Sequence, residues 1–388
     1  VSGHEGMPRG KFGEFIKIIM KQLLDLAYRG KTVFLTGHTG FKGAWLAHWL
    51  LSLGAKVHGY ALDPEPQAIL YDQLRLSSRL ESDTRADIAD EGRLFSLISE
   101  IRPDFVFHLA AQPLVQLSYK IPVKTFETNV MGTIHILDAI RRANIECRVI
   151  CITTDKCYQN NEWLYAYREI DPMGGHDPYS ASKGCAELAI ACYRQSYFPT
   201  NGSVRLSVCR AGNVIGGGDW ALDRIIPDCI RSLRQGRVIP VRNRTSTRPW
   251  QHVLEPLSGY LLTGAALDHP EWWQRDNISA FDSFNFGPNL TSNKTVADLV
   301  DELIRQMGDG AWEDQSDPLA PHEASKLNLA IDKAYHILHW QPTWNFETTL
   351  QKTAEWYQLD AQGDDMSEVT TRQITEYLAQ TPVQFLSL

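Results

Sequence analysis

Two short runs contain the side chains best suited to acid–base and redox chemistry. The run Thr153-Thr154-Asp155-Lys156 places hydroxyls, a carboxyl and an amine next to one another. Further on, Tyr179 and Lys183 are four residues apart, so both point to one face of a helix. A lysine beside a tyrosine favours the phenolate and lowers its pKa. A phenolate can accept a hydroxyl proton while hydride leaves the same carbon, so the pair predicts oxidation of an alcohol.

Each of these signals has a simpler alternative. The Tyr-x-x-x-Lys spacing also occurs on solvated helix faces, and Asp155 and Lys156 could form a surface ion pair where a strand ends. Their position after an expected strand favours the catalytic interpretation, because ligands of open α/β sheets bind at the carboxyl ends of the strands.

A glycine-rich loop upstream has the spacing of a phosphate-binding turn. Gly37, Gly40 and Gly43 lie between an expected strand and an expected helix. Glycines there allow a tight turn, close approach of a pyrophosphate and close helix packing. Asp63 follows the second expected strand, where a carboxylate binds ribose hydroxyls and disfavours the extra phosphate of NADP. The loop and Asp63 predict NAD, and the pair Asp87-Ile88 is a candidate cover for its adenine.

The expected elements alternate between strand and helix. This rhythm predicts an α/β fold, a Rossmann-type doubly wound parallel sheet with a smaller mixed C-terminal lobe. The expected strands are 31–36, 56–61, 104–109, 148–153 and 204–209, and the expected helices are 44–51, 91–101, 128–143 and one that begins at Pro178.

Three segments are predicted along the chain. Residues 1–29 are interpreted as a leader, of which Val1–Ile19 are an expression leader and Met20 a natural start. Residues 30–212 are the NAD-binding Rossmann domain. Residues 213–388 are mainly a substrate-binding lobe, although part of 250–290 could return to the sheet, and a terminal helix is expected after about Gln362.

Composition excludes several classes of protein. The chain has 388 residues, 43% hydrophobic and 22% charged, and a net charge of −8, which argues against a nucleic-acid partner. Its seven cysteines include no Cys-x-x-Cys pair, and no His-Glu-x-x-His run is present, so no metal site is expected. No apolar run is long enough for a membrane span. A cytoplasmic protein with reduced thiols is the prediction.

The chain resembles the extended short-chain dehydrogenase/reductase family over about residues 30 to 345. The resemblance rests on ordered motifs: the Gly37–Gly43 loop, His108–Gln112, Thr128–Thr133, Tyr179-x-x-x-Lys183 and Arg210–Asn213. Within the family, sugar 4,6-dehydratases carry Thr-Asp-Glu where this chain has Thr154-Asp155-Lys156, whereas epimerases have no such acid/base pair. The resemblance also implies that Phe41, Ala110 and Ala111 contact the cofactor.

A dehydratase of this kind oxidises the sugar at C4, eliminates water across C5 and C6, and returns hydride from NADH to C6. The resemblance implies that Tyr179 and Lys183 carry out the oxidation, that Thr154 orients the C4 hydroxyl and that Asp155 is the acid. The acid requires a raised pKa. Lys156 departs from the usual Glu, and it could remove the C5 proton or, while charged, stabilise the enolate.

The substrate side is marked by an excess of arginine. Residues 224–248 hold seven arginines, which suits an anionic diphosphate. The resemblance places Asn213, Arg224 and Arg248 on the sugar nucleotide and Arg242 against its base. Further runs such as Gly216–Trp220 and Arg248–Leu257 resemble bacterial members that act on CDP-glucose and form CDP-4-dehydro-6-deoxyglucose for lipopolysaccharide O-antigen sugars.

Relatives often dimerise through two helices, here near 128–143 and 178–197, so a homodimer or higher homo-oligomer is expected. Three other functions stay open: a nucleotide-sugar 4-epimerase, a dehydratase for another nucleotide hexose, and a non-catalytic NAD-binding regulatory protein. An epimerase would keep the C6 hydroxyl, whereas a regulatory protein would bind NAD without turnover.

Overall fold

The computed structural model describes residues 20–270, 282–316 and 326–381. The segment Val1–Ile19, predicted as an expression leader, lies outside the described residues. Residues 20–28 form a helix whose Leu24 and Tyr28 are buried in the main hydrophobic core. The Tyr28 hydroxyl also donates to the Leu261 carbonyl oxygen over 2.6 Å, so this part of the predicted leader belongs to the fold.

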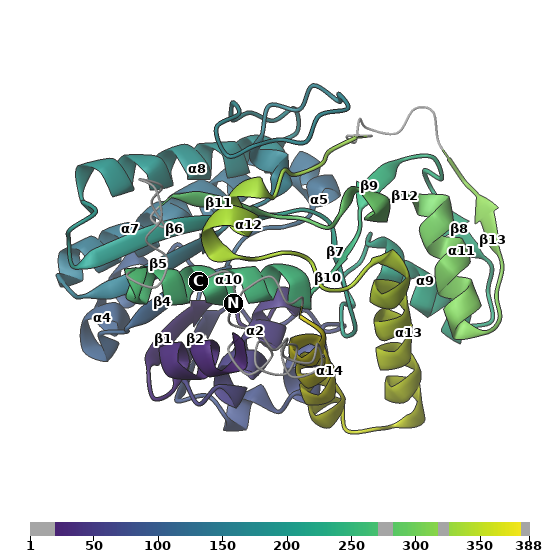
Figure 1. The fold of residues 1–388 in the computed structure, drawn as a ribbon, viewed down its shortest axis with the longest axis horizontal. Coiled ribbons are helices and arrows are strands. Elements are labelled where there is room, and N and C mark those ends of the chain that lie inside the picture. The colour runs from purple at the N-terminus through teal and green to yellow at the C-terminus, as the bar shows by residue number, and fades with distance from the viewer. Residues whose placement is uncertain (1–19, 271–281, 317–325, 382–388) are drawn as a thin grey trace, which may run out of the picture.

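A seven-stranded parallel sheet lies at the centre of the molecule (Figure 1). The strand order is β11-β6-β5-β4-β1-β2-β3. From β1, the chain first adds strands on one side and then, beginning with β4, on the other side. The predicted doubly wound fold is therefore confirmed. The strands are β1 Thr32–Thr36, β2 Lys56–Ala61, β3 Ser82–Arg85, β4 Phe105–His108, β5 Cys147–Ile152, β6 Val204–Ala211 and β11 Ser283–Phe286.

The central strands are apolar on both faces because helices cover both. In β4, Phe105 and Phe107 belong to one hydrophobic cluster and Val106 to another. In β5, Ile150 belongs to the first of these clusters and Val149 to the second. Successive side chains of a strand point to opposite faces, so a short continuous apolar run indicates a strand buried on both faces.

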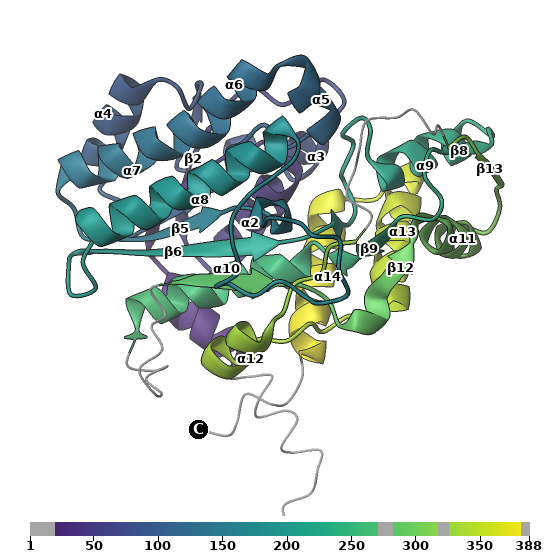
Figure 2. The same cartoon turned by 90° about the horizontal axis from the view of Figure 1, so that it is seen from above.

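Figure 2 shows the helices in two layers, with α4, α7 and α8 on one face of the sheet and α10 and α12 on the other. The first layer comprises α4 Glu91–Ile101, α5 Val115–Lys120, α6 Pro122–Phe126, the π-helical turn η2 Glu127–Met131, α7 Gly132–Ala143 and α8 Pro178–Ser196. The other layer comprises α2 Phe41–Ser52, α10 Leu254–Asp268 and α12 Asp332–Leu338. The short α3 Leu70–Gln73 and 3₁₀ turn η1 Leu76–Ser78 join β2 to β3.

A smaller lobe lies beyond the carboxyl ends of the strands (Figures 1 and 2). It contains three two-stranded sheets, β7–β10, β8–β13 and β9–β12. Its elements are β7 Val214–Ile215, α9 Ile225–Arg234, β8 Ile239–Val241, β9 Thr247–Pro249, β10 Gln251–His252, η5 Leu290–Ser292, β12 Asn293–Thr295, α11 Val296–Met307 and β13 Trp312–Asp314.

Two C-terminal helices join the lobe to the sheet. Helix α13, Phe346–Gln362, packs on α11, and α14, Met366–Gln380, packs on α2. Lys352 of α13 pairs with Glu376 of α14 at 2.7 Å, and His48 of α2 hydrogen-bonds Thr371 of α14 at 2.8 Å. Because α10, β11 and α14 follow residue 212 yet pack on the sheet or its helices, both predicted segments contribute to one main core.

In the described ranges, no helix combines the length and the apolar character needed to cross a membrane. The same residues contain no group of three His, Cys, Asp or Glu side chains arranged to hold a metal ion.

Candidate active site

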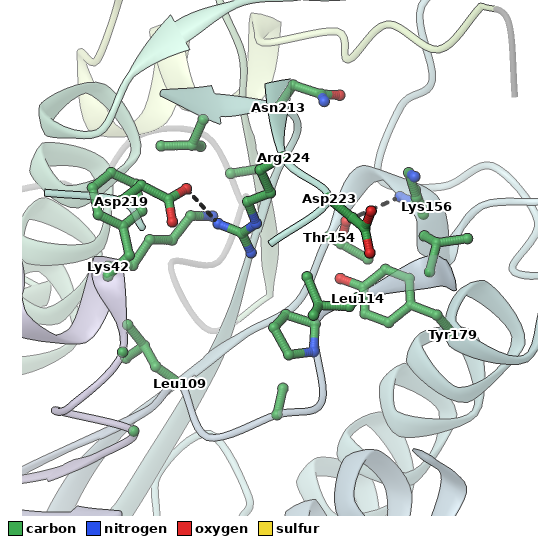
Figure 3. A pocket seen from close by; sticks show the side chains of 18 of the residues that line it. Lys42, Leu109, Leu114, Thr154, Lys156, Tyr179, Asn213, Asp219, Asp223 and Arg224 are labelled. Carbon is green, nitrogen blue, oxygen red and sulfur yellow. Dashed lines mark hydrogen bonds and ion pairs between the residues drawn. The ribbon is translucent and has the colours of Figure 1, made fainter. Parts of the chain in front are cut away.

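One large cavity lies at the carboxyl edge of the sheet, between the sheet and the smaller lobe. Its volume is about 800 Å³, enough for more than one small ligand. Figure 3 shows it from close by, with Thr154, Lys156 and Tyr179 toward one side and Lys42 with the Asp219–Arg224 pair toward the other. All predicted site residues except Asp63 line this cavity.

The glycine loop has the backbone geometry of a phosphate cradle. Gly37 has a φ of 77°, and a Cβ there would lie 2.8 Å from the Ala110 nitrogen. A Cβ on Gly43 would lie 2.0 Å from the Gly37 carbonyl oxygen, so the helix can approach only without a side chain. Gly40 is the N-cap of α2, and within the described residues no side chain caps that helix. The first N–H groups of α2 can therefore bind a pyrophosphate, and the loop fits a dinucleotide.

Two predicted adenosine contacts differ in their placement. Asp87 lines the cavity beside Ile88, accepts from the Ala89 N–H and pairs with Lys124 at 3.0 Å. Burial alone would raise the pKa of Asp87, but the Ala89 N–H and Lys124 together lower it below its usual value. Asp63 follows β2 as expected, yet its side chain is 86% exposed, lies outside the cavity lining and is 3.9 Å from Arg85.

The Thr154–Lys156 segment follows β5 and forms the start of the 3₁₀ turn η3, Asp155–Cys157. Thr154 Oγ1 donates to Asp155 Oδ1 over 3.0 Å and accepts from the Lys156 N–H over 3.4 Å. The Asp155 side chain is 2% exposed, and its Oδ2 has no hydrogen-bond partner among the described residues. Burial raises the pKa of Asp155, although Lys156 and the Thr154 hydrogen bond oppose the rise. A buried carboxyl with a raised pKa can hold the proton that a general acid donates.

Tyr179 and Lys183 lie in the first two turns of α8, which begins with N-cap Asp177 and Pro178. Both are buried and line the cavity. Burial raises the pKa of Tyr179 above its usual value, while a hydrogen bond with Thr154 lowers it. Burial lowers the pKa of Lys183 to about 8. Burial therefore shifts the pKa of Tyr179 in the direction opposite to the lowering expected from Lys183.

The predicted substrate side is partly assembled. Arg248 is buried at the cavity wall, and its charge lowers the pKa of Asp155. Arg224 pairs with Asp219 at 2.9 Å, and Asn213 also lines the cavity. Arg242 is 63% exposed and pairs with Asp223 at 2.8 Å, so it lies at the rim.

Five charged residues of the cavity lining were not predicted as site residues: Lys42, Lys124, Asp219, Asp223 and Asp228. Lys42 lies between Phe41 and Gly43 of the loop, and burial followed by the Arg224 charge lowers its pKa to about 8. Asp219 and Asp223 are the partners of the two arginines named above. A charged residue inside the glycine loop was a readable signal for Lys42, whereas only the tertiary fold brings the two acids to the cavity.

Comparisons with known proteins agree with this arrangement. The family model for GDP-mannose 4,6 dehydratase matches residues 34–353. A CDP-glucose 4,6-dehydratase from Salmonella typhimurium is 46% identical over 358 residues, which cover 91% of this chain and 98% of the relative. A dTDP-glucose 4,6-dehydratase from Shigella flexneri is 26% identical, over 84% of this chain and 92% of its own.

Solved structures share the fold at lower identity. A dTDP-glucose 4,6-dehydratase from Streptomyces venezuelae with NAD bound superposes with a TM-score of 0.72 at 22% identity, covering 87% of this chain and 99% of the other. A UDP-glucose 4-epimerase from Thermotoga maritima superposes with a TM-score of 0.69 at 21% identity. The match covers 85% of this chain and 99% of the epimerase. Both reactions occur on this fold, so the site residues rather than the fold distinguish them. The chain belongs to the GDP-mannose 4,6 dehydratase family, the nucleotide-sugar dehydratase branch of the extended short-chain dehydrogenases/reductases that its motifs predict.

Proposed function

We propose that this chain is an NAD-dependent lyase that converts CDP-glucose to CDP-4-dehydro-6-deoxyglucose and water. The observation that carries the proposal is the buried carboxyl of Asp155, held in the same cavity as Tyr179 and Lys183. An acid at this position serves elimination, whereas a 4-epimerase has no use for it. The 46% identity to a CDP-glucose 4,6-dehydratase supports cytidine as the base.

We assign cofactor binding to residues 30–212 and substrate binding mainly to residues 213–388. When bound, NAD would supply the hydride chemistry, as acceptor for oxidation at C4 of the sugar and, once reduced, as donor at C6. The Gly37–Gly43 loop and the first turn of α2 would hold its pyrophosphate, and Ile88, Ala110 and Ala111 line the same cavity.

Tyr179 takes the proton of the C4 hydroxyl in the oxidation. Tyr179 and Thr154 line the same cavity, and their interaction lowers the pKa of the phenol against the effect of burial. Lys183 lies one helical turn away, and its ammonium favours the phenolate as the proton arrives. The two residues share α8, so the helix itself fixes their spacing.

Asp155 donates its proton to the departing C6 hydroxyl. A raised pKa keeps this proton available, and Oδ2 has no hydrogen-bond partner among the described residues, so a ligand oxygen could pair with it. Lys156 lines the cavity next to it and has one of two roles: its neutral amine removes the C5 proton, or its ammonium stabilises the enolate. Its replacement by arginine, described below, separates the two roles.

Arg248 and Arg224 bind the diphosphate of the substrate, with Asn213 beside them. All three line the cavity, and Arg224 lies close enough to Lys42 of the glycine loop for its charge to lower the pKa of Lys42, which supports an anionic ligand there. Arg242, at the rim, is the candidate for stacking on the base.

We propose a homodimer formed through the face of α6, η2 and α8. Val123, Met131, Leu188 and Tyr197 are exposed apolar side chains of this region. A second copy seated there would cover them. Sedimentation of Leu188→Arg should yield monomer, and an unchanged sedimentation coefficient would argue against this face.

We also place the protein in the cytoplasm. The seven cysteines, all within the described residues, are free thiols, which suits a reducing compartment.

The direct test is incubation with NAD and a panel of nucleotide hexoses. CDP-glucose should lose the mass of one water and give a 4-keto product with a near-ultraviolet band in alkali. A C4 epimer of unchanged mass would indicate an epimerase. Preferred turnover of another nucleotide hexose would correct the substrate, and NAD binding without turnover of any sugar would indicate a regulatory protein.

A further inference from the structure

An ion pair is buried directly behind the catalytic residues. We propose that Glu187, paired with Arg210, is a positioning residue for the reaction proposed above. It holds the segments that carry the catalytic groups and keeps the ammonium of Lys183 charged. This inference rests on the proposed function, and its test below includes a measurement that needs only NAD.

The pair is fully enclosed and bidentate. Glu187 comes from α8 and Arg210 from β6, and their side chains are 4% and 5% exposed. Arg210 Nε donates to Glu187 Oε1 over 2.8 Å, and its Nη2 donates to Oε2 over 2.9 Å. Burial of two charges costs so much desolvation that such a pair adds little net stability. A role in the site is therefore the better reason for its presence.

The pair connects three segments that line the active site. Thr153, next to Thr154, donates its hydroxyl to Glu187 Oε1. Arg210 Nη1 donates to the Tyr158 hydroxyl over 2.7 Å, and Tyr158 directly follows the turn that holds Asp155. Arg210 itself lies two residues before Gly212 in the chain. A shift of this pair would therefore move the ends of β5 and β6 together.

Glu187 also acts on Lys183 through its negative charge, because Lys183 lies one turn earlier on α8. Of the charges that raise the pKa of Lys183, that of Glu187 is the largest. On α8, Tyr179 and Glu187 lie one turn to either side of Lys183, and burial raises the pKa of the Tyr179 phenol. The titratable groups from the surrounding elements are Cys151, Cys157, His108 and Lys42.

The other facing groups cannot replace this charge. Burial raises the pKa values of the Cys151 and Cys157 thiols, so both are neutral. Burial lowers the pKa of His108 to about 3, so the imidazole is neutral too, and Lys42 is a cation. Without Glu187, the desolvated ammonium of Lys183 would lose its proton near or below neutral pH.

Two substitutions separate charge from geometry. Glu187→Gln keeps the length of the side chain and removes its charge, whereas Glu187→Asp keeps the charge and shortens the side chain. In both, NAD affinity is measured by quenching of tryptophan fluorescence between acidic and alkaline pH, and turnover of CDP-glucose is measured alongside. NAD affinity and turnover should both fall as the pH becomes alkaline. The midpoint of this fall should be lower by about one pH unit or more in Glu187→Gln and unchanged in Glu187→Asp.

A buried acid at the opposite end of the same sheet provides the matched control. Asp268 pairs with Arg148 of β5 at 2.9 Å, far from the cavity lining, and both side chains are largely buried. Asp268→Asn should lower the melting temperature and leave both pH profiles unchanged. If Glu187→Gln behaves like Asp268→Asn, the pair is only structural and the inference is overturned.

Glu187→Gln leaves the buried charge of Arg210 unpaired, which could impair folding. A second variant therefore removes both charges. Glu187→Gln with Arg210→Met removes both charges and should show the same alkaline shift; a profile like that of the unsubstituted protein would overturn the inference. If the unsubstituted protein turns over no nucleotide sugar while its NAD profile shifts as described, the proposed function fails and the inference stands.

Discussion

The backbone at Gly212 leaves just enough room for the Asp155 carboxylate, which suggests an informative substitution. A Cβ added at Gly212 would lie 2.8 Å from Asp155 Oδ2, whereas ordinary contacts begin at 3.4 Å. In Gly212→Ala the carboxylate must therefore move by about 0.6 Å, the difference 3.4 − 2.8. The atom that moves is the end of a side chain, so the backbone need not shift.

The expected effect is on catalysis rather than on folding. A misplacement of about 1 Å can cost on the order of 100-fold in rate, so about 0.6 Å should slow elimination on the order of 10-fold. The nearest atom of any other residue to the added Cβ is Pro249 Cγ at 3.4 Å, which is ordinary contact. Unfolding free energy should change by less than about 1 kcal/mol.

Rapid mixing of Gly212→Ala with NAD and CDP-glucose should show normal formation of reduced cofactor followed by its delayed disappearance. Gly287→Ala is the control, because its added Cβ would meet Leu329 Cβ at 3.3 Å, away from the cavity lining. Elimination at the unsubstituted rate in Gly212→Ala would refute the role of Asp155 geometry. A matching loss in Gly287→Ala would assign the effect to the backbone.

Four further outcomes are expected. Tyr179→Phe should lower oxidation by on the order of 100-fold or more while ligand binding persists; unchanged turnover would remove Tyr179 from the redox step. Asp155→Asn should slow elimination more than oxidation, and an unaltered elimination rate would point to another acid. Lys156→Arg, which stays charged, should retain elimination if Lys156 stabilises the enolate and lose it if Lys156 is the base, as deuterium exchange at C5 would show. Burial raises the pKa of Glu255 from 4.5 to about 7, so the folded protein binds an extra proton between these values and loses stability as pH rises through them. Denaturant titrations should show a loss on the order of 3 kcal/mol that Glu255→Gln abolishes, and a pH-independent unfolding free energy would contradict it.

The parts of the site that could be predicted are those fixed by local chain geometry. Tyr179 and Lys183 share a helix whose start is marked by Asp177 and Pro178. The Thr154–Lys156 run follows a continuous apolar strand, so its place at the sheet edge follows from the parallel topology. Gly37 and Gly43 occupy positions where a Cβ would clash, which is why their spacing was informative.

The remaining features depend on tertiary surroundings. Strand β3 was not predicted, because Ser82–Arg85 are all polar, half-buried and at the sheet edge. Asp63 lies at the expected position in the chain, but nothing in a sequence fixes the direction of an exposed side chain. Desolvation likewise has no sequence signal, so the raised pKa of Tyr179 was missed.

The packing of α13 and α14 has a consequence for engineering. Because α13 packs on α11 and on α14, and α14 packs on α2, these two helices connect the lobe to the layer that covers the sheet. Residues 30–212 expressed alone would leave Trp45 and Trp49 without their C-terminal partners. Residues 30–212 are therefore not a separable module, and we expect chimaeras that exchange them to need both C-terminal helices as well.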